Sequence, residues 1–122
     1  MPRGRKATGV TYADVRGWAL ALPGASEVIV EQWGDHPTLR VSNKMFASGA
    51  PGWPTMSIKA SLEDQAELIA SDPQTYSVAA YTGRYGWVQV ELGRADPDEL
   101  RGLIIEAWRR TATKRLQAQY DG

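Results

Sequence analysis

Several short stretches of this 122-residue chain alternate apolar and polar residues, and this alternation restricts the fold more than any other feature. The clearest case is segment 87–92, in which Val88, Val90 and Leu92 share one side. The other side carries Trp87 and two polar residues. A strand with one apolar side belongs in a sheet that has one face buried and the other in water. We therefore expect an antiparallel sheet with a core-facing side and an open side.

The other extended segments are short and are separated by turn-forming residues. In chain order they are residues 27–33, 38–42, 45–48, 55–59 and an edge strand within 75–80. Asn43-Lys44 suits a tight hairpin, and the Gly- and Pro-rich stretch 49–54 cannot continue a ladder. This spacing predicts an antiparallel meander.

Three segments carry the signals of helices. Thr11 and Ser61 each precede an aspartate at the third helical position, which is typical of an N-terminal cap. Asp96 followed by Pro97 marks the start of the third helix. The first and last helices have apolar stripes at helical spacing, and a half-buried sheet needs such helices over one face. We therefore predict an α+β two-layer sandwich, with N- and C-terminal helices packed on one face of the sheet.

The boundaries of the domain follow from the same pattern. A chain of this length is expected to form one domain. We expect a flexible arm over residues 1–9, a single domain over residues 10–116 and a frayed polar tail over residues 117–122. Within the second helix, the stripe of Leu62, Ala66 and Ile69 is predicted to face the core.

Composition excludes several classes of protein. The chain has no cysteine, which excludes disulfides and thiolate metal sites. Its formal net charge is zero, whereas dedicated nucleic-acid binders are usually basic. No apolar run approaches the roughly 20 residues of a membrane helix, and the basic N-terminus lacks the apolar core of a signal peptide. We expect a cytoplasmic monomer with no membrane partner.

Residue patterns of catalysis are missing from the sequence. The only histidine, His36, precedes Pro37 in a predicted turn and is interpreted as a surface residue. It has no second ligand at metal-binding spacing, and no GxSxG or GxGxxG motif is present. We therefore expect no catalytic residue, no metal, no cofactor and no enzymatic activity.

The open side of the sheet is the predicted recognition surface. If the strand parities hold, six side chains emerge there: Arg40, Ser57, Lys59, Trp87, Gln89 and Glu91. A register slip of one residue would reverse this set. The hypothesis depends above all on Lys59 and Trp87 emerging together on the face that no helix covers.

Aromatic and basic residues near position 85 have two interpretations. Arg84, Tyr85 and Trp87 could stack on bases and pair with phosphates. Alternatively, the tyrosine and tryptophan cap the edge of the core, and the stems of basic side chains cover them. Trp53 is also open to two interpretations, because an exposed side chain would indicate a contact site and a buried one a plug.

The order of these segments resembles the MmcQ/YjbR family of small bacterial proteins. The residues that carry the resemblance are 11–16, 21–24, 37–41, 44–47, 57–59, 85–88, 98–100, 107–108 and 114–116. Together they span roughly residues 10–116. The resemblance implies a CyaY-like fold, which is shared with iron proteins of the frataxin type. Those proteins use an acidic first helix, whereas this helix has Asp14 beside Arg16, so iron binding is not expected.

The resemblance also implies a function. The family carries a DNA-binding label, and its transfer to this chain falls on Arg40, Lys44, Lys59, Arg84 and Trp87. The chain departs from the family in its insertion at residues 49–54 and in its neutral charge balance. The alternative is a module that binds a small ligand or a protein partner in an aromatic cleft around Trp53, Tyr85 and Trp87.

Overall fold

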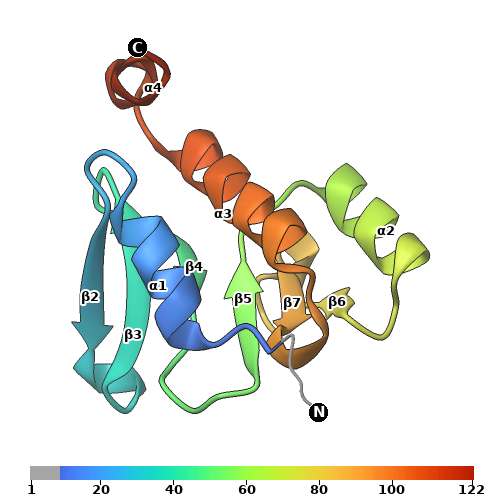
Figure 1. Ribbon diagram of the computed structural model, residues 1–122. Coiled ribbons are helices and arrows are strands. Elements are labelled where there is room, and N and C mark those ends of the chain that lie inside the picture. The colour runs from blue at the N-terminus through green and yellow to red at the C-terminus, as the bar shows by residue number, and fades with distance from the viewer. Residues whose placement is uncertain (1–8) are drawn as a thin grey trace.

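The computed structural model describes residues 9–122, so the predicted N-terminal arm lies, except for Gly9, outside the described residues. One antiparallel sheet and four α-helices make up this part of the chain (Figure 1). In chain order the elements are α1 (Tyr12–Leu20), β2 (Ser26–Val30), η1 (Glu31–Trp33), β3 (His36–Val41), β4 (Lys44–Ser48), β5 (Thr55–Ile58), α2 (Leu62–Ser71), β6 (Tyr76–Val78), η2 (Gly83–Tyr85), β7 (Val88–Glu91), η3 (Leu92–Arg94), α3 (Pro97–Thr111) and α4 (Lys114–Asp121).

The sheet has six strands in the order β2-β3-β4-β5-β7-β6. Strands β2 to β5 follow one another as the predicted meander, and β7 then pairs with β5 on one side and with β6 on the other. In this register Val88 lies beside Ile58 and Val78. The predicted α+β class with an antiparallel sheet is confirmed.

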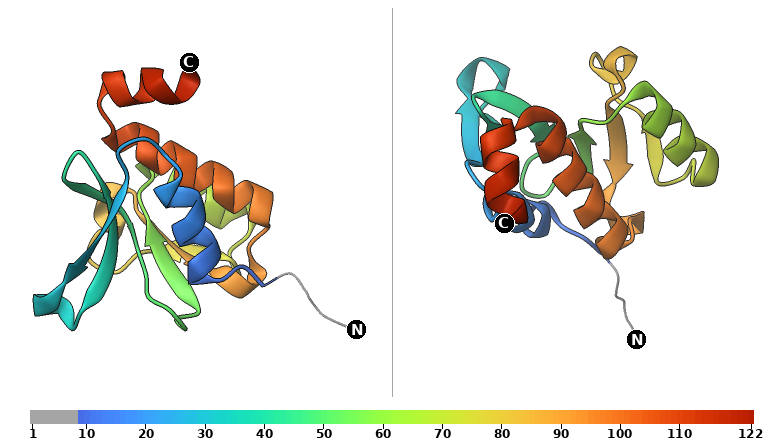
Figure 2. Two further views of the ribbon diagram at one scale, coloured as in Figure 1. Left: turned by 60° about the vertical axis from the view of Figure 1, so that its left-hand side comes forward. Right: turned by 90° about the horizontal axis from the view of Figure 1, so that it is seen from above.

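Helices α1 and α3 lie on the same face of the sheet, as the three views show (Figures 1 and 2). The core forms between these helices and the sheet. Val88, Val90, Met56 and Ile58 all point into it and are buried, so the predicted parity of β5 and β7 is confirmed. We call this side of the sheet the covered face and the opposite side the open face.

The helix starts also agree with prediction. The backbone N–H of Asp14 donates to Thr11 Oγ1 at 3.3 Å, and that of Glu99 donates to Asp96 Oδ2 at 2.9 Å. Each bond satisfies a backbone donor that the first turn of a helix leaves without an intrahelical partner. These contacts are local in sequence, which is why the pattern alone predicts them.

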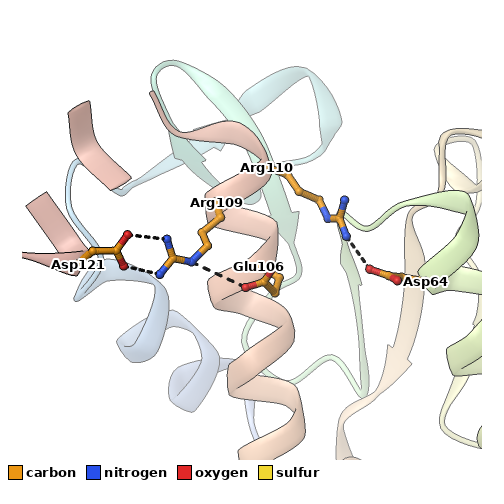
Figure 3. Close-up of polar contacts among 5 residues, drawn as sticks. All are labelled: Asp64, Glu106, Arg109, Arg110 and Asp121. Carbon is orange, nitrogen blue, oxygen red and sulfur yellow. Dashed lines mark hydrogen bonds and ion pairs between the residues drawn. The ribbon is translucent and has the colours of Figure 1, made fainter. Parts of the chain in front are cut away.

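Helix α2 is rotated relative to the prediction. Leu62, expected in the apolar stripe, is 59% exposed, whereas the polar Gln65 is buried. The helix flanks β6 at the edge of the sheet (Figure 1), so only a narrow side of it meets the rest of the protein. An ion pair between Arg110 and Asp64, 2.5 Å long, links it to α3 (Figure 3).

Residues 117–121 are helical, which corrects the expectation of a frayed tail. They belong to α4, whose Asp121 accepts two hydrogen bonds from Arg109 at 2.6 and 3.2 Å (Figure 3). The Tyr120 ring packs against Trp108 with 5.4 Å between ring centroids. Contacts with residues of α3 therefore support a helix whose own sequence is mostly polar.

Candidate functional site: an aromatic cavity on the open face

A cavity of about 620 Å³ lies on the open face of the sheet. Its volume is in the range typical of small-molecule sites. Strands, turns and loops all contribute to its lining, which consists of Trp33, His36, Met45, Ser48, Trp53, Ser57, Ala80, Tyr81, Thr82 and Trp87. Aromatic side chains dominate this set, and they come from segments far apart in the sequence.

Three of the five tryptophans of the chain line this cavity. Trp33 ends η1 and is 58% exposed, and Trp53 lies in the loop between β4 and β5 and is 51% exposed. Trp87 immediately precedes β7 and is only 7% exposed. Because Val88 faces the core, strand alternation directs Trp87 to the open face, where the residues around the cavity cover it.

His36 lies between two of these tryptophans. Its ring centroid is 6.4 Å from that of Trp33 and 4.9 Å from that of Trp53. The rings are tilted by 56° and 50° relative to His36, so they form angled walls rather than a parallel stack. The sequence-based interpretation of His36 as an ordinary surface residue missed this arrangement, because Trp53 approaches it from a distant loop.

Gln65 fixes the backbone next to Trp87. Its side-chain amide donates to the carbonyl oxygens of Gly83 and Trp87, each at 2.7 Å. Gly86 adopts a φ of +102°, and a Cβ there would come within 2.5 Å of the Ser61 carbonyl carbon. Only glycine suits this close approach. Helix α2 and its N-terminal turn thus position Trp87, a role that no local sequence pattern indicated for Gln65.

Tyr81 occupies a strained turn at the margin of the cavity. Its φ is +62°, and the Thr82 N–H donates to the Ala80 carbonyl oxygen at 2.6 Å across it. A three-residue turn with positive φ is rare and strained, and such residues cluster at functional sites. The Tyr81 side chain is 96% exposed, so the strain presents an aromatic ring to solvent beside the cavity.

A smaller hollow of about 110 Å³ continues the cavity along the sheet. The two share His36, Ser48, Trp53 and Ser57. The smaller hollow adds the polar side chains of Thr55 and Gln89. The combined site is therefore aromatic at one end and offers hydrogen-bonding groups at the other.

Another cavity, of about 360 Å³, lies beside α1 and includes Tyr12, Arg16 and Glu27. Its polar groups already bind one another, because the Tyr12 hydroxyl donates to Glu27 at 2.7 Å and Arg16 pairs with Glu27 at 3.0 Å. Burial and the Glu27 carboxylate raise the pKa of Tyr12, which keeps this phenol protonated. A satisfied cluster of this kind stabilises the contact between α1 and β2.

The predicted pairing of Lys59 and Trp87 on the open face is wrong. Strand β5 ends at Ile58, and the Lys59 amine then donates to Thr111 Oγ1 of α3 at 3.2 Å. Lys59 therefore reaches toward the covered face, whereas Trp87 lies on the open face. Burial, with Lys44 and Arg110 nearby, lowers the pKa of the Lys59 amine.

The other predicted site residues are dispersed. Arg40 lies opposite Met45, a cavity residue, and its Nε donates to Thr38 Oγ1 at 2.9 Å. Arg84 lies over the ring of Tyr85, 4.8 Å from its centroid. Neither of these two residues lines the aromatic cavity. The structure thus brings together Trp53 and Trp87 of the predicted cleft, but not Tyr85.

Two further observations concern ligands and membranes. Within residues 9–122, histidine, aspartate and glutamate side chains do not gather in groups of three that could hold a metal ion. In the same part of the chain, every helix is too short or too polar to cross a bilayer.

Comparisons with known proteins place the fold. The YjbR family model matches residues 20–110, which is most of the chain. The crystal structure of Deinococcus radiodurans protein DR2400, with the family-model domain DUF419, is similar with a TM-score of 0.73 and 21% sequence identity. The similarity covers 85% of this chain and 80% of that chain. A search of curated proteins finds no match. The chain belongs to the YjbR family.

Proposed function

We propose that this protein is a non-enzymatic binding protein whose open face receives an apolar or aromatic group of a small ligand or of a protein side chain. The observation that carries the proposal is the cavity in which Trp33, Trp53 and Trp87 meet. Large apolar side chains that line a hollow with a few polar groups are typical of ligand sites.

Exposure of these side chains supports the proposal. Trp33 and Trp53 leave about half of their surface in water. Aromatic residues exposed together on one face are enriched at sites that bind partners. The strained and exposed Tyr81 adds a third solvent-facing ring to the same place.

Nucleic acid, the ligand that the family label suggests, has less support. Binding to DNA depends mainly on several phosphate contacts from lysine and arginine. Among the residues that line the cavity within the described chain, none is lysine or arginine. Lys59 is engaged by α3, and Arg84 lies over Tyr85. These two residues therefore do not contribute to a phosphate-binding rim around the aromatic cavity.

The test uses nuclear magnetic resonance of the five indole N–H groups. The protein is titrated with p-cresol and with cyclohexanol, which present a small aromatic and a small apolar group. We expect the signals of Trp33, Trp53 and Trp87 to shift, while those of Trp18 and Trp108 stay in place as internal controls, because neither lines the cavity. If the three cavity signals do not move even at the highest concentrations of both ligands, the proposal is refuted.

Matched variants connect binding to the cavity. Trp53→Ala should abolish the shifts, whereas Tyr85→Ala, which removes an exposed aromatic ring outside the cavity, should retain them. Labelled single- and double-stranded DNA is titrated in parallel at low and high salt. Saturable, salt-sensitive DNA binding that Trp53→Ala leaves intact and Arg84→Ala weakens would favour the nucleic-acid function instead.

A further inference from the structure

We propose that the group received by the aromatic cavity is a methylated ammonium cation, either on a free small molecule or on a methylated lysine side chain. This inference rests on the proposed function and adds the chemical class of the ligand. It is argued from the geometry of the rings, from the charges around them and from the polar extension of the cavity.

Ring geometry favours a compact group over a flat one. A planar ligand is best held between parallel rings, whereas the rings of Trp33 and Trp53 are tilted relative to His36 by 56° and 50°. Aromatic side chains from several segments of the chain line the cavity in which such a group would lie. The faces of aromatic rings carry partial negative charge and attract cations, most strongly in tryptophan. Methylated ammonium groups combine that charge with apolar methyl surface, which suits such walls.

Charges around the cavity agree with a cationic ligand. Within the described residues, the lining contains no lysine or arginine that would repel a cation. Glu31 shares the η1 turn with Trp33, and Asp35 directly precedes His36. Neither carboxylate forms an ion pair within residues 9–122. Arg40, on the strand beside Met45, lies outside the lining of the cavity but keeps its positive charge, because its Nε donates to the neutral hydroxyl of Thr38.

The smaller hollow gives the rest of the ligand a place. Its Thr55, Ser57 and Gln89 side chains offer neutral donors and acceptors beyond Trp53. A hydroxyl or amide that follows the ammonium group could bind them without a charged partner. Choline carries such a hydroxyl, and a methylated lysine carries a chain that leads to peptide groups.

The test compares two molecules of nearly the same shape. Choline and 3,3-dimethylbutan-1-ol differ in that a quaternary nitrogen replaces a carbon atom, so only choline is charged. Both are titrated into the full chain, and the cavity tryptophan signals are followed. We expect choline to bind about tenfold more tightly, as cation–π interactions in partly desolvated sites imply. A trimethyllysine peptide, with its unmethylated lysine counterpart, distinguishes a protein-borne cation from a free one.

Variants at Trp53 separate the attraction of the ring face from simple packing. Trp53→Phe keeps an aromatic face, whereas Trp53→Leu keeps only apolar volume. Choline affinity should fall several-fold further in the leucine variant, while the affinity of dimethylbutanol should differ little between the two. Trp53 is half exposed in a loop, so both variants should fold, and the dispersion of their amide spectra verifies this.

The outcomes separate the inference from the proposed function. Equal binding of both molecules, or tighter binding of dimethylbutanol, would overturn the inference that the ligand is a cation, while the proposed function as an apolar binding site would remain. Binding of p-cresol without choline or the methylated peptide would do the same. If none of the probes moves the cavity signals, the proposed function fails together with the inference.

Discussion

The two faces of the sheet differ in composition and in what covers them: the covered face is apolar, whereas the open face carries polar side chains such as Ser57 and Gln89 beside its tryptophans. Helices α1 and α3 close the covered face, and Trp108 of α3 is fully buried there with its indole N–H bonded to the Pro23 carbonyl oxygen at 2.9 Å. Loops and turns cover the open face, and their tryptophans leave a cavity between them. Trp108 therefore serves stability on the covered face, whereas Trp33 and Trp53 keep about half of their surface exposed on the open face.

The strongest test of this difference replaces one tryptophan on each face. Trp108→Ala should lower the free energy of unfolding by about 3–5 kcal/mol, because it leaves a large void in a packed core. Trp53→Ala should cost less than about 1 kcal/mol, because half of that side chain is already in water. Urea denaturation measures both. Similar losses at the two positions would contradict the division between the faces.

Gly86 tests how firmly the open face is attached to α2. Gly86→Ala should lower the free energy of unfolding by about 1–3 kcal/mol or more, because the residue has positive φ and its Cβ would meet the backbone of residues 60–62. Gly93→Ala is the matched control, since a Cβ there meets nothing within 4 Å. If thermal denaturation gives the two variants equal midpoints, the close approach at Gly86 does not contribute to the stability of the fold.

Gln65 tests whether α2 holds Trp87 in place. Gln65→Met keeps the length of the side chain but leaves the Gly83 and Trp87 carbonyl oxygens without their donor, which should cost about 1–3 kcal/mol. The Trp87 indole signal should also broaden or move. The variant Gln65→Glu should be worse still, because a carboxylate would face two carbonyl oxygens. A methionine variant with native stability and an unchanged Trp87 signal would rule out this role.

Replacement of Tyr81 should raise the stability of the protein, whereas replacement of Gly86 or Gln65 should lower it. Tyr81→Gly relieves the positive φ and should raise the stability by at most about 1 kcal/mol, since glycine adopts this conformation freely but orders at a higher entropic cost. Ligand affinity should fall at the same time, because the exposed ring beside the cavity is lost. A combined measurement of melting temperature and probe binding checks this. Loss of both stability and binding would show that Tyr81 has a structural role instead.

The smallest effect is expected at α4. Hydrogen bonds from Arg109 lower the pKa of Asp121, so its contribution is present above the ordinary aspartate pKa and is lost as the pH falls through the lowered value. The contact between Tyr120 and Trp108 should therefore loosen in acid, which the Tyr120 ring signals report. Asp121→Asn should loosen it at neutral pH as well, unlike Glu106→Gln, whose pair with Arg109 is longer at 3.8 Å. Tyr120 ring signals that do not change with pH would contradict a role of the Asp121 carboxylate in holding this contact.

Local patterns predicted those parts of the fold that depend on neighbours in sequence. Asp96 and Pro97 predicted the start of α3, and the alternation of Val88 and Val90 predicted which side of β7 faces the core. Both signals depend only on residues a few positions apart. The same parity correctly directs Trp87 to the open face.

Prediction failed where a contact joins distant segments. Strand parity predicted that Lys59 lies on the same face as Trp87. However, β5 ends at Ile58, and the Lys59 amine is directed by its hydrogen bond to Thr111 of α3. Helical spacing identified a stripe in α2 but not its rotation at the edge of the sheet, which exposes Leu62 and buries Gln65. Trp33 and Trp53 meet at His36 only because β3 and the loop after β4 come together in the folded chain.

The cavity has a consequence for how relatives of this chain could diverge. Its three tryptophans lie in the short 3-10 turn η1 after β2, in the loop after β4 and at the residue before β7, while the α-helices contribute none of its lining residues. Segments of this kind tolerate exchange far better than packed helices do. Ligand preference could therefore be altered one loop at a time while the hydrophobic interior is inherited unchanged, so that proteins with this same scaffold could recognise quite different molecules.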